Sequence, residues 1–430
     1  MKEKSNEATS EFSRRNFIKA SAAVSMAAIL PGTERLFAAG SDKLRVGIIG
    51  CGGRGTGAAI DCLNAADGVE IVAIGDLFKD RVDSSLVKLR EKHCDRVKVT
   101  SDTCFVGFSA YKKVIACDVN LIIMAPPPHF RPMHLKAAIE ANKHVFMEKP
   151  VGVDPVGIRS VIATSELAEK KGLAVVAGTQ RRHQAHYLEI MKRIHKGDIG
   201  QIVAGQCYWN MGALWVKPRQ DDWSDMEWQC RNWLYFTWLS GDHIVEQHVH
   251  NLDIINWAIG SHPVQVMGMG GRQVRTGPEY GNIFDHFAVE YEYPDNVRVL
   301  SMCRQTDGCS FRVAESLVGT KGQAYTDHTT GFIKGPTPYE LPEGETPNPY
   351  VQEHKDLVES IRSGRCLNEG KRVAESTLTA IMGRMSAYTG RALKWDWAMN
   401  ASKLDLTPPQ YEMCELPAAE VAVPGKTQLI

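Results

Sequence analysis

The chain has 430 residues, of which 43% are hydrophobic and 23% are charged, and its formal net charge is zero. Composition and length are those of a globular protein of two-domain size, and the balanced charge argues against nucleic acid or an anionic membrane as a partner. Beyond residue 40, no stretch is long and apolar enough to cross a bilayer, which takes roughly 20 apolar residues. We therefore expect no membrane span in the mature chain.

The N-terminal region has the layout of a twin-arginine export signal. Arg14 and Arg15 precede a short apolar stretch at 20–30. We assign residues 1–40 to a signal peptide and expect export by the twin-arginine route. The protein would be periplasmic, or held on the outer face of the inner membrane if the signal is not cleaved. Because this route carries folded proteins, a cofactor can be loaded before export.

Strand and helix patterns alternate from residue 43 to residue 178. Continuous apolar runs predict buried parallel strands, and the stretches between them predict helices. The expected strands are 44–49, 69–74, 118–124, 144–147 and 173–177, and the expected helices are 58–63, 80–92, 133–141 and 153–170. This alternation is typical of a Rossmann-type α/β domain, doubly wound around a parallel sheet.

The pattern changes after residue 178 and predicts a second, α+β domain at 179–400. Longer β-rich runs indicate an open sheet that is largely antiparallel or mixed. The expected strands are 202–209, 264–269, 287–293, 297–304 and 323–326, and the expected helices are 185–194, 352–363 and 372–389. The tail at 401–430 is rich in proline, and we expect no regular element in it.

A glycine-rich loop follows the first expected strand. Gly50, Gly52 and Gly55 fit the G-x-G-x-x-G pattern of a dinucleotide-binding turn. In this pattern the glycines permit a tight turn, close approach of the backbone to the pyrophosphate and close packing of the next helix. The helix N-terminus then offers N–H groups to phosphate. Gly53 and Arg54 lie in the same loop, and we assign both to the cofactor site.

An acidic residue ends the second expected strand. Asp76 is placed to accept hydrogen bonds from the ribose hydroxyls and to repel a 2′-phosphate, so NAD is favoured over NADP. Lys79 and Arg81 leave NADP open, because basic groups near this ribose bind the 2′-phosphate. The ends of the next two strands lie at the same edge of the sheet, so we add Pro126, His129 and Glu148 to the cofactor site.

Two motifs farther along resemble those of the Gfo/Idh/MocA oxidoreductase family, which includes glucose-fructose oxidoreductase and inositol dehydrogenase. They are E-K-P at 148–150 and H-x-x-D-x-x-x-W at 250–257. The likeness covers the chain from residue 43 to about residue 397. It implies an NAD(P)-binding Rossmann domain and a second domain whose open sheet carries the substrate and the interface of a dimer or tetramer. It also implies that Lys149 and His250 face the substrate at the nicotinamide.

The chemistry of these side chains is consistent with that role. Oxidising a secondary alcohol needs a base for the hydroxyl proton while hydride leaves the carbon. Lys149 is suited to relay the proton or to polarise a carbonyl. On a continuous helix, Glu246, His250, Asp253 and Trp257 would share one face, and the Glu246 carboxylate would orient the imidazole. The family usually has Asp at this position, so Glu246 is a departure with a longer reach.

The same stretch also suggests a metal site as an alternative. Imidazole and carboxylate ligands are available from His243, Glu246, His248 and His250. On a helix, however, His248 points away from His250, and a cationic lysine nearby would oppose a metal. We therefore predict no metal.

Aromatic residues gather between 209 and 238. Six of the nine tryptophans fall there: Trp209, Trp215, Trp223, Trp228, Trp233 and Trp238. Their flat faces suit the C–H face of a sugar ring, and packing in the core or at an oligomer interface is the alternative. We assign Arg181, Arg182, Trp238 and His248 to the substrate site.

These observations predict an exported oxidoreductase that keeps its NAD and moves hydride to or from a ring carbon of a sugar, glycoside or cyclitol. Three alternatives remain open. The first is a redox-neutral glycoside hydrolase that oxidises, eliminates and reduces with the same NAD. The second is an oxidoreductase in which a second sugar or keto compound regenerates the NAD. The third is a non-catalytic carbohydrate-binding protein with a Rossmann fold.

Overall fold

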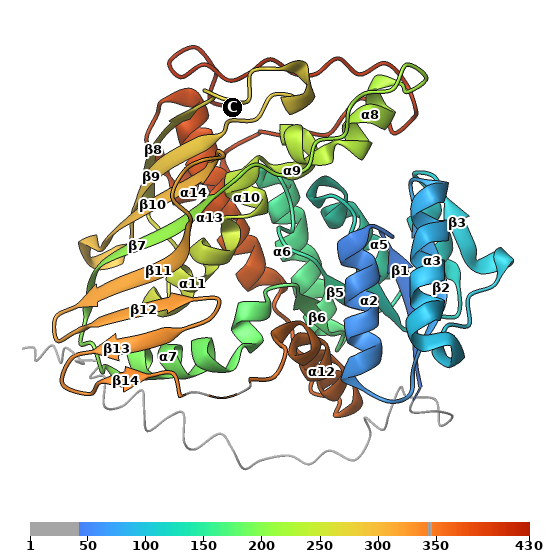
Figure 1. Cartoon of the computed structure of the whole chain (residues 1–430), viewed down its shortest axis with the longest axis horizontal. Helices are drawn as coiled ribbons and strands as arrows, with labels where there is room; N and C mark the ends of the chain where they lie inside the picture. Colours follow the sequence, from blue (N-terminus) through green and yellow to red (C-terminus); the bar gives the residue numbers. More distant parts are fainter. Residues whose placement is uncertain (1–42, 343, 345) are drawn as a thin grey trace, which may run out of the picture. The chain divides into compact units, whose positions relative to one another are not determined.

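The computed structural model describes residues 43–342, 344 and 346–430 (Figure 1). The predicted export signal at 1–40 lies outside the described residues. In the part of the chain that is described, no helix has both the length and the apolar character that a membrane span requires.

A six-stranded parallel sheet organises the N-terminal part, in the order β3-β2-β1-β4-β5-β6. Its strands are β1 (Leu44–Ile49), β2 (Val69–Asp76), β3 (Cys104–Val106), β4 (Leu121–Met124), β5 (His144–Met147) and β6 (Val175–Ala177). The helices between them are α2 (Gly53–Ala65), α3 (Lys79–His93), α4 (Ala110–Ala116), α5 (Arg131–Glu140) and α6 (Pro155–Lys170). The predicted Rossmann-type fold is confirmed. Helix α2 starts five residues before the predicted helix, because the glycine loop itself forms the first turn.

A nine-stranded mixed sheet follows, in the order β14-β13-β12-β11-β7-β10-β9-β8-β15. Its strands are β7 (Ile202–Met211), β8 (Gln265–Gly271), β9 (His286–Glu292), β10 (Arg298–Gln305), β11 (Arg312–Gly319), β12 (Gln323–Asp327), β13 (Gly331–Lys334), β14 (Tyr339–Glu340) and β15 (Leu393–Lys394). Strands β7 and β10 are parallel, and the other neighbours are antiparallel. The predicted open mixed sheet is confirmed.

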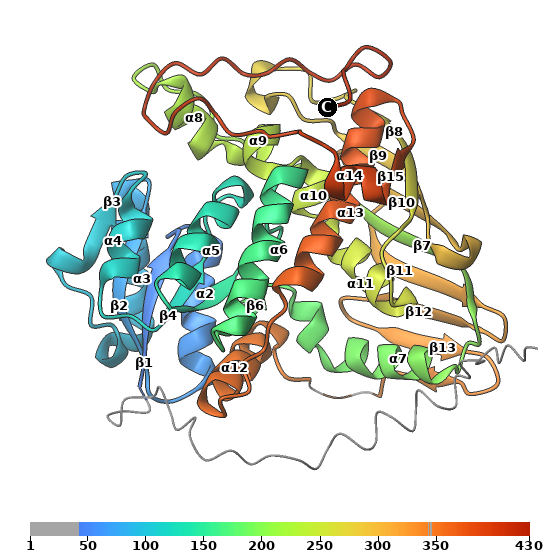
Figure 2. The ribbon, with the colours of Figure 1, turned by 180° about the vertical axis from the view of Figure 1, so that it is seen from behind.

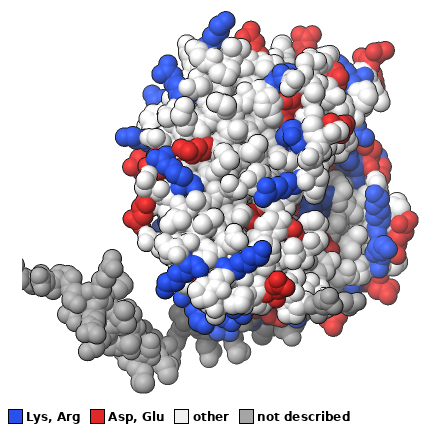
Figure 3. All heavy atoms as spheres, turned by 60° about the vertical axis from the view of Figure 1, so that its left-hand side comes forward, with Lys and Arg blue, Asp and Glu red and all other residues white. Residues whose placement is uncertain are grey.

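Helices cover one face of this sheet, as Figures 1 and 2 show. They include α7 (Ala185–Lys196), α11 (Val249–Ile259) and α13 (Gly370–Thr389), which share one hydrophobic core with the strands. On the strands, Met267 and Met269 are 62% and 70% exposed, and Leu300 and Met302 are exposed as well. Figure 3 turns the sheet side of the molecule forward and shows broad uncharged areas between scattered basic and acidic side chains.

The C-terminal part returns to the first sheet. Helix α12 (Pro349–Arg362) packs beside α2 (Figure 2), and Leu357, Val358 and Ile361 join the core of the parallel sheet. After α14 (Trp395–Asn400), the chain has no further helix or strand, as predicted for the tail. The tail runs along α8 (Asp225–Arg231), where the Met226 amide donates a hydrogen bond to the Cys414 carbonyl, 3.1 Å away.

Candidate active site

A cavity of about 690 Å³ opens at the carboxyl edge of the parallel sheet. Its wall includes the glycine loop, the ends of β2, β4 and β5, and residues from 209–250. In open parallel sheets, ligands bind at this edge. Of the residues predicted for the cofactor, all but His129 line the cavity: Gly50, Gly52, Gly53, Arg54, Gly55, Asp76, Pro126 and Glu148.

The glycine loop has the shape that a dinucleotide needs. Gly50 has a φ of +93°, and a Cβ there would collide with the backbone at Ala125. A Cβ on Gly55 would overlap the carbonyl oxygen of Gly50, so this glycine lets α2 pack closely. A Cβ on Gly52 or Gly53 would meet no protein atom, so the space beside them is open to a ligand. Helix α2 has no side-chain cap at its N-terminus, which leaves its first N–H groups for a phosphate.

Asp76 is fixed at the end of β2 by two backbone hydrogen bonds. Its Oδ2 accepts from the Cys51 amide at 2.6 Å, and its Oδ1 accepts from the Phe78 amide at 3.0 Å. Burial raises the pKa of Asp76, and these hydrogen bonds oppose the rise. Each oxygen keeps a lone pair for a ribose hydroxyl. Arg81 also lines the cavity, whereas Lys79 is exposed and pairs with Asp83.

Arg54 connects the glycine loop to the end of β5. Its Nε donates to Glu148 at 2.5 Å, and its terminal nitrogens form ion pairs with Asp61 at 3.3 Å and with Glu353 of α12 at 3.2 Å. Burial alone would lower the pKa of Arg54, but Glu148 and Glu353 raise it above its ordinary value. Burial and the charge of Glu148 hold the pKa of Glu353 well above its ordinary range. The cavity wall therefore contains a permanent guanidinium paired with a carboxylate.

Lys149 and Glu246 form an ion pair at the cavity. The Lys149 Nζ lies 3.0 Å from the Glu246 Oε1 and 2.5 Å from the Glu246 carbonyl oxygen, to which it donates. Both side chains are largely buried, at 13% and 11% exposed. The second carboxylate oxygen of Glu246 is buried without a partner among the described residues. The lysine is thus held in one place with a carboxylate beside it.

The continuous helix expected through Glu246 and His250 is not found. Helix α10 (His243–Glu246) ends at Glu246, and α11 begins at Val249, so the 4-residue spacing does not place the two side chains on one face. Among the described residues, the Glu246 carboxylate accepts a hydrogen bond from Lys149 and none from His250. The predicted role of Glu246 in orienting the imidazole therefore lacks the expected geometry.

His250 lines the cavity close to the lysine pair. Its ring stacks on Trp209, with centroids 5.7 Å apart and planes at 18°. Burial lowers the pKa of His250 well below its ordinary value, and the charges of Lys149 and Arg181 lower it further. Burial and these neighbouring charges therefore favour the neutral imidazole.

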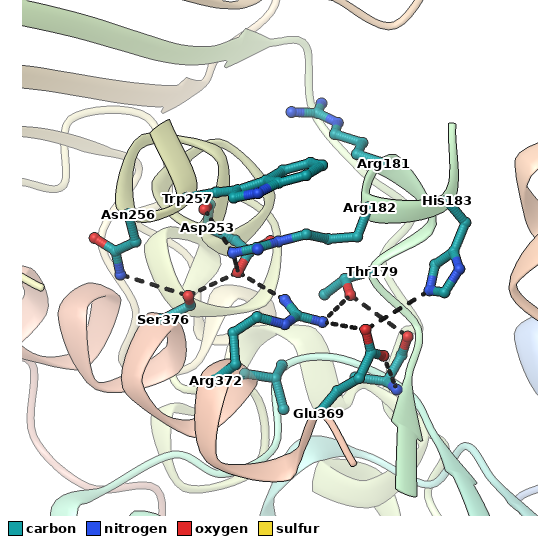
Figure 4. Close-up of polar contacts among 12 residues, drawn as sticks. Thr179, Arg181, Arg182, His183, Asp253, Asn256, Trp257, Glu369, Arg372 and Ser376 are labelled. Atoms are coloured by element: carbon teal, nitrogen blue, oxygen red, sulfur yellow. Dashed lines mark hydrogen bonds and ion pairs between the residues drawn. The ribbon is translucent and has the colours of Figure 1, made fainter. Parts of the chain in front are cut away.

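Asp253 and Trp257 lie on α11 but belong to a different cluster, drawn in Figure 4. Asp253 accepts from Arg182 at 2.8 Å, from Arg372 at 3.0 Å and from the Ser376 hydroxyl at 2.7 Å. The Arg182 guanidinium lies 4.4 Å from the centre of the Trp257 ring. Arg182 was predicted to contact substrate, but the structure pairs it with Asp253 and it does not line the cavity.

Two other residues predicted for the substrate site lie behind the cavity wall. Arg181 is buried and donates to Glu315 at 2.5 Å, with its guanidinium 5.6 Å from the Trp209 ring. His248 is fully buried with its Nε2 2.6 Å from the Ser301 hydroxyl, and burial lowers the pKa of His248 to about 3. In these positions they support Trp209 and the sheet and do not reach the cavity.

Trp238 and His129 lie beside the cavity in an aromatic cluster. The Trp238 Nε1 donates to Gln229 at 2.7 Å, and the His129 ring meets Trp238 edge-on at 5.0 Å. His129 also has its Nε2 2.8 Å from the Tyr411 hydroxyl, and burial lowers its pKa to about 4. Neither residue lines the cavity.

The tryptophans divide between the two roles considered from the sequence. Trp209, Trp215 and Trp233 line the cavity, whereas the remaining three pack in the aromatic cluster. Several cavity residues were not predicted: Phe78, Arg131, Lys217, Gln247 and Tyr350. Tyr350 comes from α12, some 300 residues after the glycine loop, and no motif in the sequence signals such a contact.

No metal centre is evident in the described part of the chain, where no three His, Cys, Asp or Glu side chains gather in a suitable group. Of the four possible ligands, His243 is buried against Phe287 and His248 is bound to Ser301. The four side chains therefore do not converge on one point.

The fold and the cavity define a protein with a dinucleotide-binding domain of the Rossmann type and a second domain built on an open mixed sheet. The chain belongs to the Gfo/Idh/MocA oxidoreductase family. Residues 44–179 match the family described as oxidoreductase family, NAD-binding Rossmann fold, and residues 187–325 match the GFO/IDH/MocA C-terminal domain. Residues 11–31 match the twin-arginine translocation pathway signal sequence, which indicates export.

Among curated relatives, the chain is 25% identical to 2,7-anhydro-N-acetylneuraminate hydratase of Escherichia coli K12, over 58% of the chain and 62% of that protein. It is 31% identical to inositol 2-dehydrogenase of Salmonella typhimurium, over 38% of the chain and 46% of that protein. It is 27% identical to a glycosyl hydrolase family 109 protein of Shewanella amazonensis, over 48% of each. The chain thus spans about half to three-fifths of these relatives' length.

Among solved structures, the aldose-aldose oxidoreductase of Caulobacter crescentus superposes with a TM-score of 0.64. The superposition covers 82% of this chain and 99% of that one, at 18% sequence identity. At this identity, the likeness shows a shared fold.

Proposed function

We propose that the protein is a periplasmic oxidoreductase that keeps a bound NAD and transfers hydride between it and a ring carbon of a sugar, glycoside or cyclitol. One observation carries the proposal. Lys149 and the neutral His250 line the same cavity as the dinucleotide loop, so the proton-handling groups face the place where a nicotinamide would lie. The names of the relatives support a carbohydrate or cyclitol as the substrate.

Each part of the cavity has a task in this reaction. The glycine loop and Asp76 would hold the pyrophosphate and the ribose. NAD bound there would supply the hydride acceptor for the carbon being oxidised. His250 accepts the hydroxyl proton, and the Lys149 ammonium donates a hydrogen bond to the same oxygen as negative charge develops on it. Trp215 and Trp233 offer flat faces to the sugar ring.

Asp76 supports NAD as the cofactor, because its carboxylate would repel a 2′-phosphate. Arg81 lines the same cavity and is the feature that favours NADP. Comparing the affinity of the protein for NADH and NADPH by fluorescence tests this choice. We expect tighter binding of NADH, and a preference for NADPH would reverse the assignment.

A redox-neutral reaction is the second candidate. Two of the relatives are named as a hydratase and a glycosyl hydrolase family 109 protein, and the net reactions of such enzymes add water without net redox change. The same His250 and Lys149 would serve. Oxidation of the hydroxyl carbon would acidify the C–H beside it, loss of that proton would expel the aglycone, water would add to the resulting double bond, and return of the hydride from the reduced cofactor would restore the hydroxyl.

Incubating the protein with a panel of sugars, cyclitols and aryl glycosides tests the function. NADH absorbance and released aglycone are followed together. Reduction of the bound NAD when a sugar is added, reversed by a second sugar or keto compound, supports the oxidoreductase that keeps its cofactor. Aglycone release without net NADH supports the redox-neutral enzyme. A protein that binds sugars but changes neither signal would be a binding protein, and the proposal would fail.

We also propose that the protein forms a homodimer or a homotetramer through the open face of the nine-stranded sheet. The exposed methionines and Leu300 on this face support the proposal, because large exposed apolar areas mark interaction sites. Light scattering on the purified protein tests it, and a monomer at micromolar concentration would contradict it.

A further inference from the structure

The cofactor cavity has a second wall that does not come from the parallel sheet. Lys217, Cys230 and Trp233 line the cavity, and they belong to the segment that follows β7. Phe78 and Arg81, just after β2, line the cavity as well, and Phe78 shares a hydrophobic cluster with Cys230 and Trp233. We call the segment 213–233, together with tail residues 411–416, the cover.

The cover is attached beside Asp76, where the adenosine ribose is expected. The Arg231 guanidinium, at the end of α8, lies 3.9 Å from the centre of the Phe78 ring. Its Nη1 is 3.2 Å from Asp80, at the start of α3, and its Nε is 2.8 Å from Glu227. One side chain therefore ties α8 to the turn between β2 and α3.

The tail part of the cover contacts both α8 and the aromatic residues beside the cavity. The Leu416 amide donates to the Asp225 carboxylate at 3.0 Å, in addition to the hydrogen bond between Met226 and Cys414. Earlier in the tail, the Tyr411 hydroxyl is 2.8 Å from the His129 Nε2, and the Tyr411 ring lies 5.9 Å from the Phe108 ring. Figures 1 and 2 show the tail running along α8 toward the parallel-sheet layer.

The composition of the two walls suits the adenosine half of a dinucleotide. Phe78 and Cys230 offer apolar surfaces to a purine, and the aromatic ring of Phe78 can stack on a base. Lys217 and Arg81 add positive charge to the lining of the cavity. The contacts of Arg231 with Phe78 and Asp80 hold this wall beside the turn that follows β2.

We propose that the cover completes the binding site of the adenosine half and slows the release of the cofactor. The inference rests on the proposed function, because it takes NAD as the ligand. It supplies the physical means by which an exported enzyme keeps a nicotinamide that it cannot replace outside the cell.

The test measures release of the cofactor without turnover. The full-length protein is loaded with NADH and chased with excess NAD, and the loss of protein-bound NADH fluorescence gives the dissociation rate. Arg231→Ala removes both the ion pair with Asp80 and the stacking on Phe78, so release should become about tenfold faster. The matched control is Arg193→Ala, whose guanidinium pairs with Glu189 at 2.8 Å and lies 4.2 Å from the Tyr339 ring, away from the cavity. We expect no change for the control.

A second variant keeps the test valid if Arg231→Ala fails to fold. Asp80 is 60% exposed, and Asp80→Asn removes the ion pair alone, which should speed release by about threefold. If the variants that fold release NADH at rates within about 1.5-fold of the wild-type rate, the proposal that the cover slows release is overturned. If the wild-type protein binds neither NADH nor NADPH, the proposed function fails as well, and the two failures are thereby distinguished.

Discussion

Two groups of charged side chains flank helix α11, and they differ in how completely their charges are paired. His250 faces the cavity with Lys149 and Glu246, where one carboxylate oxygen has no partner among the described residues. About one turn later, Asp253 is hydrogen-bonded to two arginines and a serine (Figure 4). One side of α11 thus faces the cavity, and the other carries a fully hydrogen-bonded carboxylate. Incomplete pairing beside a cavity indicates the functional side.

The pKa values follow the same division. Asp253 belongs to a network of paired side chains, here called the structural network, that also holds Arg182, His183, Glu369, Arg372 and Ser376 (Figure 4). Burial alone would raise the pKa of Glu369, but the charges of Arg372 and His183 lower it to about 2. Burial alone would lower the pKa of His183, but Asp356 and Glu369 raise it to about 9. Each group is therefore stabilised in its charged form. At the cavity, burial and the charge of Lys149 instead lower the pKa of His250 and disfavour its charged form.

The largest effect is expected at the cavity. Lys149→Ala should lower kcat by about 10²- to 10⁴-fold, because the substrate oxygen loses its hydrogen-bond donor and proton relay. The binding of NADH should change little, whereas the melting temperature should fall, because the largely buried Glu246 carboxylate loses its partner. Steady-state kinetics on the substrate found by the panel measures this effect. Lys136→Ala, which breaks an exposed pair with Glu140, is the control. A kcat within about threefold of the wild type would remove Lys149 from the mechanism.

In the structural network, the expected effect is on stability. Asp253→Asn leaves Arg182 and Arg372 buried without their carboxylate, which should lower the free energy of unfolding by about 3–5 kcal/mol. Urea unfolding followed by circular dichroism measures it. Asp83→Asn, at an exposed pair, should change stability by less than about 1 kcal/mol. Equal effects of the two substitutions would show that the network contributes no special stability.

The same network predicts a pH dependence. His183 has a pKa of about 9 in the folded protein against an ordinary value of 6.5. Its stabilisation is therefore complete below pH 6.5 and is lost as the pH rises toward 9. His183→Gln should destabilise the protein by on the order of 2 kcal/mol at about pH 6 and by little at about pH 9.5. Urea midpoints at the two pH values measure the difference. A destabilisation that does not depend on pH would contradict the charged imidazole.

The smallest effect is expected at the rim of the cavity. Trp215 is 44% exposed, so Trp215→Ala should raise KM about threefold to tenfold with little change in kcat. Trp215→Phe keeps a flat face and should recover most of the affinity. If kcat falls and KM does not rise, Trp215 acts on the reaction and not on the ground-state binding of the sugar.

Local signals in the sequence predicted ten of the fifteen strands, and β3, β11, β13, β14 and β15 were not predicted. Strands β1 and β5 match their predicted bounds, because each is a short, continuous apolar run that ends where polar residues begin. Strand β11 was missed. Its centre holds Glu315, which is buried and accepts from Arg181, Asn251, Tyr187 and Thr326. A charged residue in the middle of a strand hides the alternation that marks it, and its partners lie far away in the sequence.

The candidate site was predicted where a motif carries its own local geometry. The glycine loop, Asp76, Glu148 and Lys149 follow strands directly, so their place at the sheet edge could be inferred from the sequence. Arg182 and His248 could not be placed, because their partners Asp253 and Ser301 come from elements that only the folded chain brings near. The interruption between α10 and α11 also has no clear signal, since no glycine or proline stands at 247–248.

The central claim is that this protein keeps a nicotinamide at the Lys149 and His250 edge of the sheet. The most direct test is to purify it without added nicotinamide, denature it and quantify the released cofactor by mass spectrometry. The account predicts close to one NAD or NADH per chain, released only on denaturation. A protein that yields no nicotinamide, and that binds none when it is added, would contradict the account.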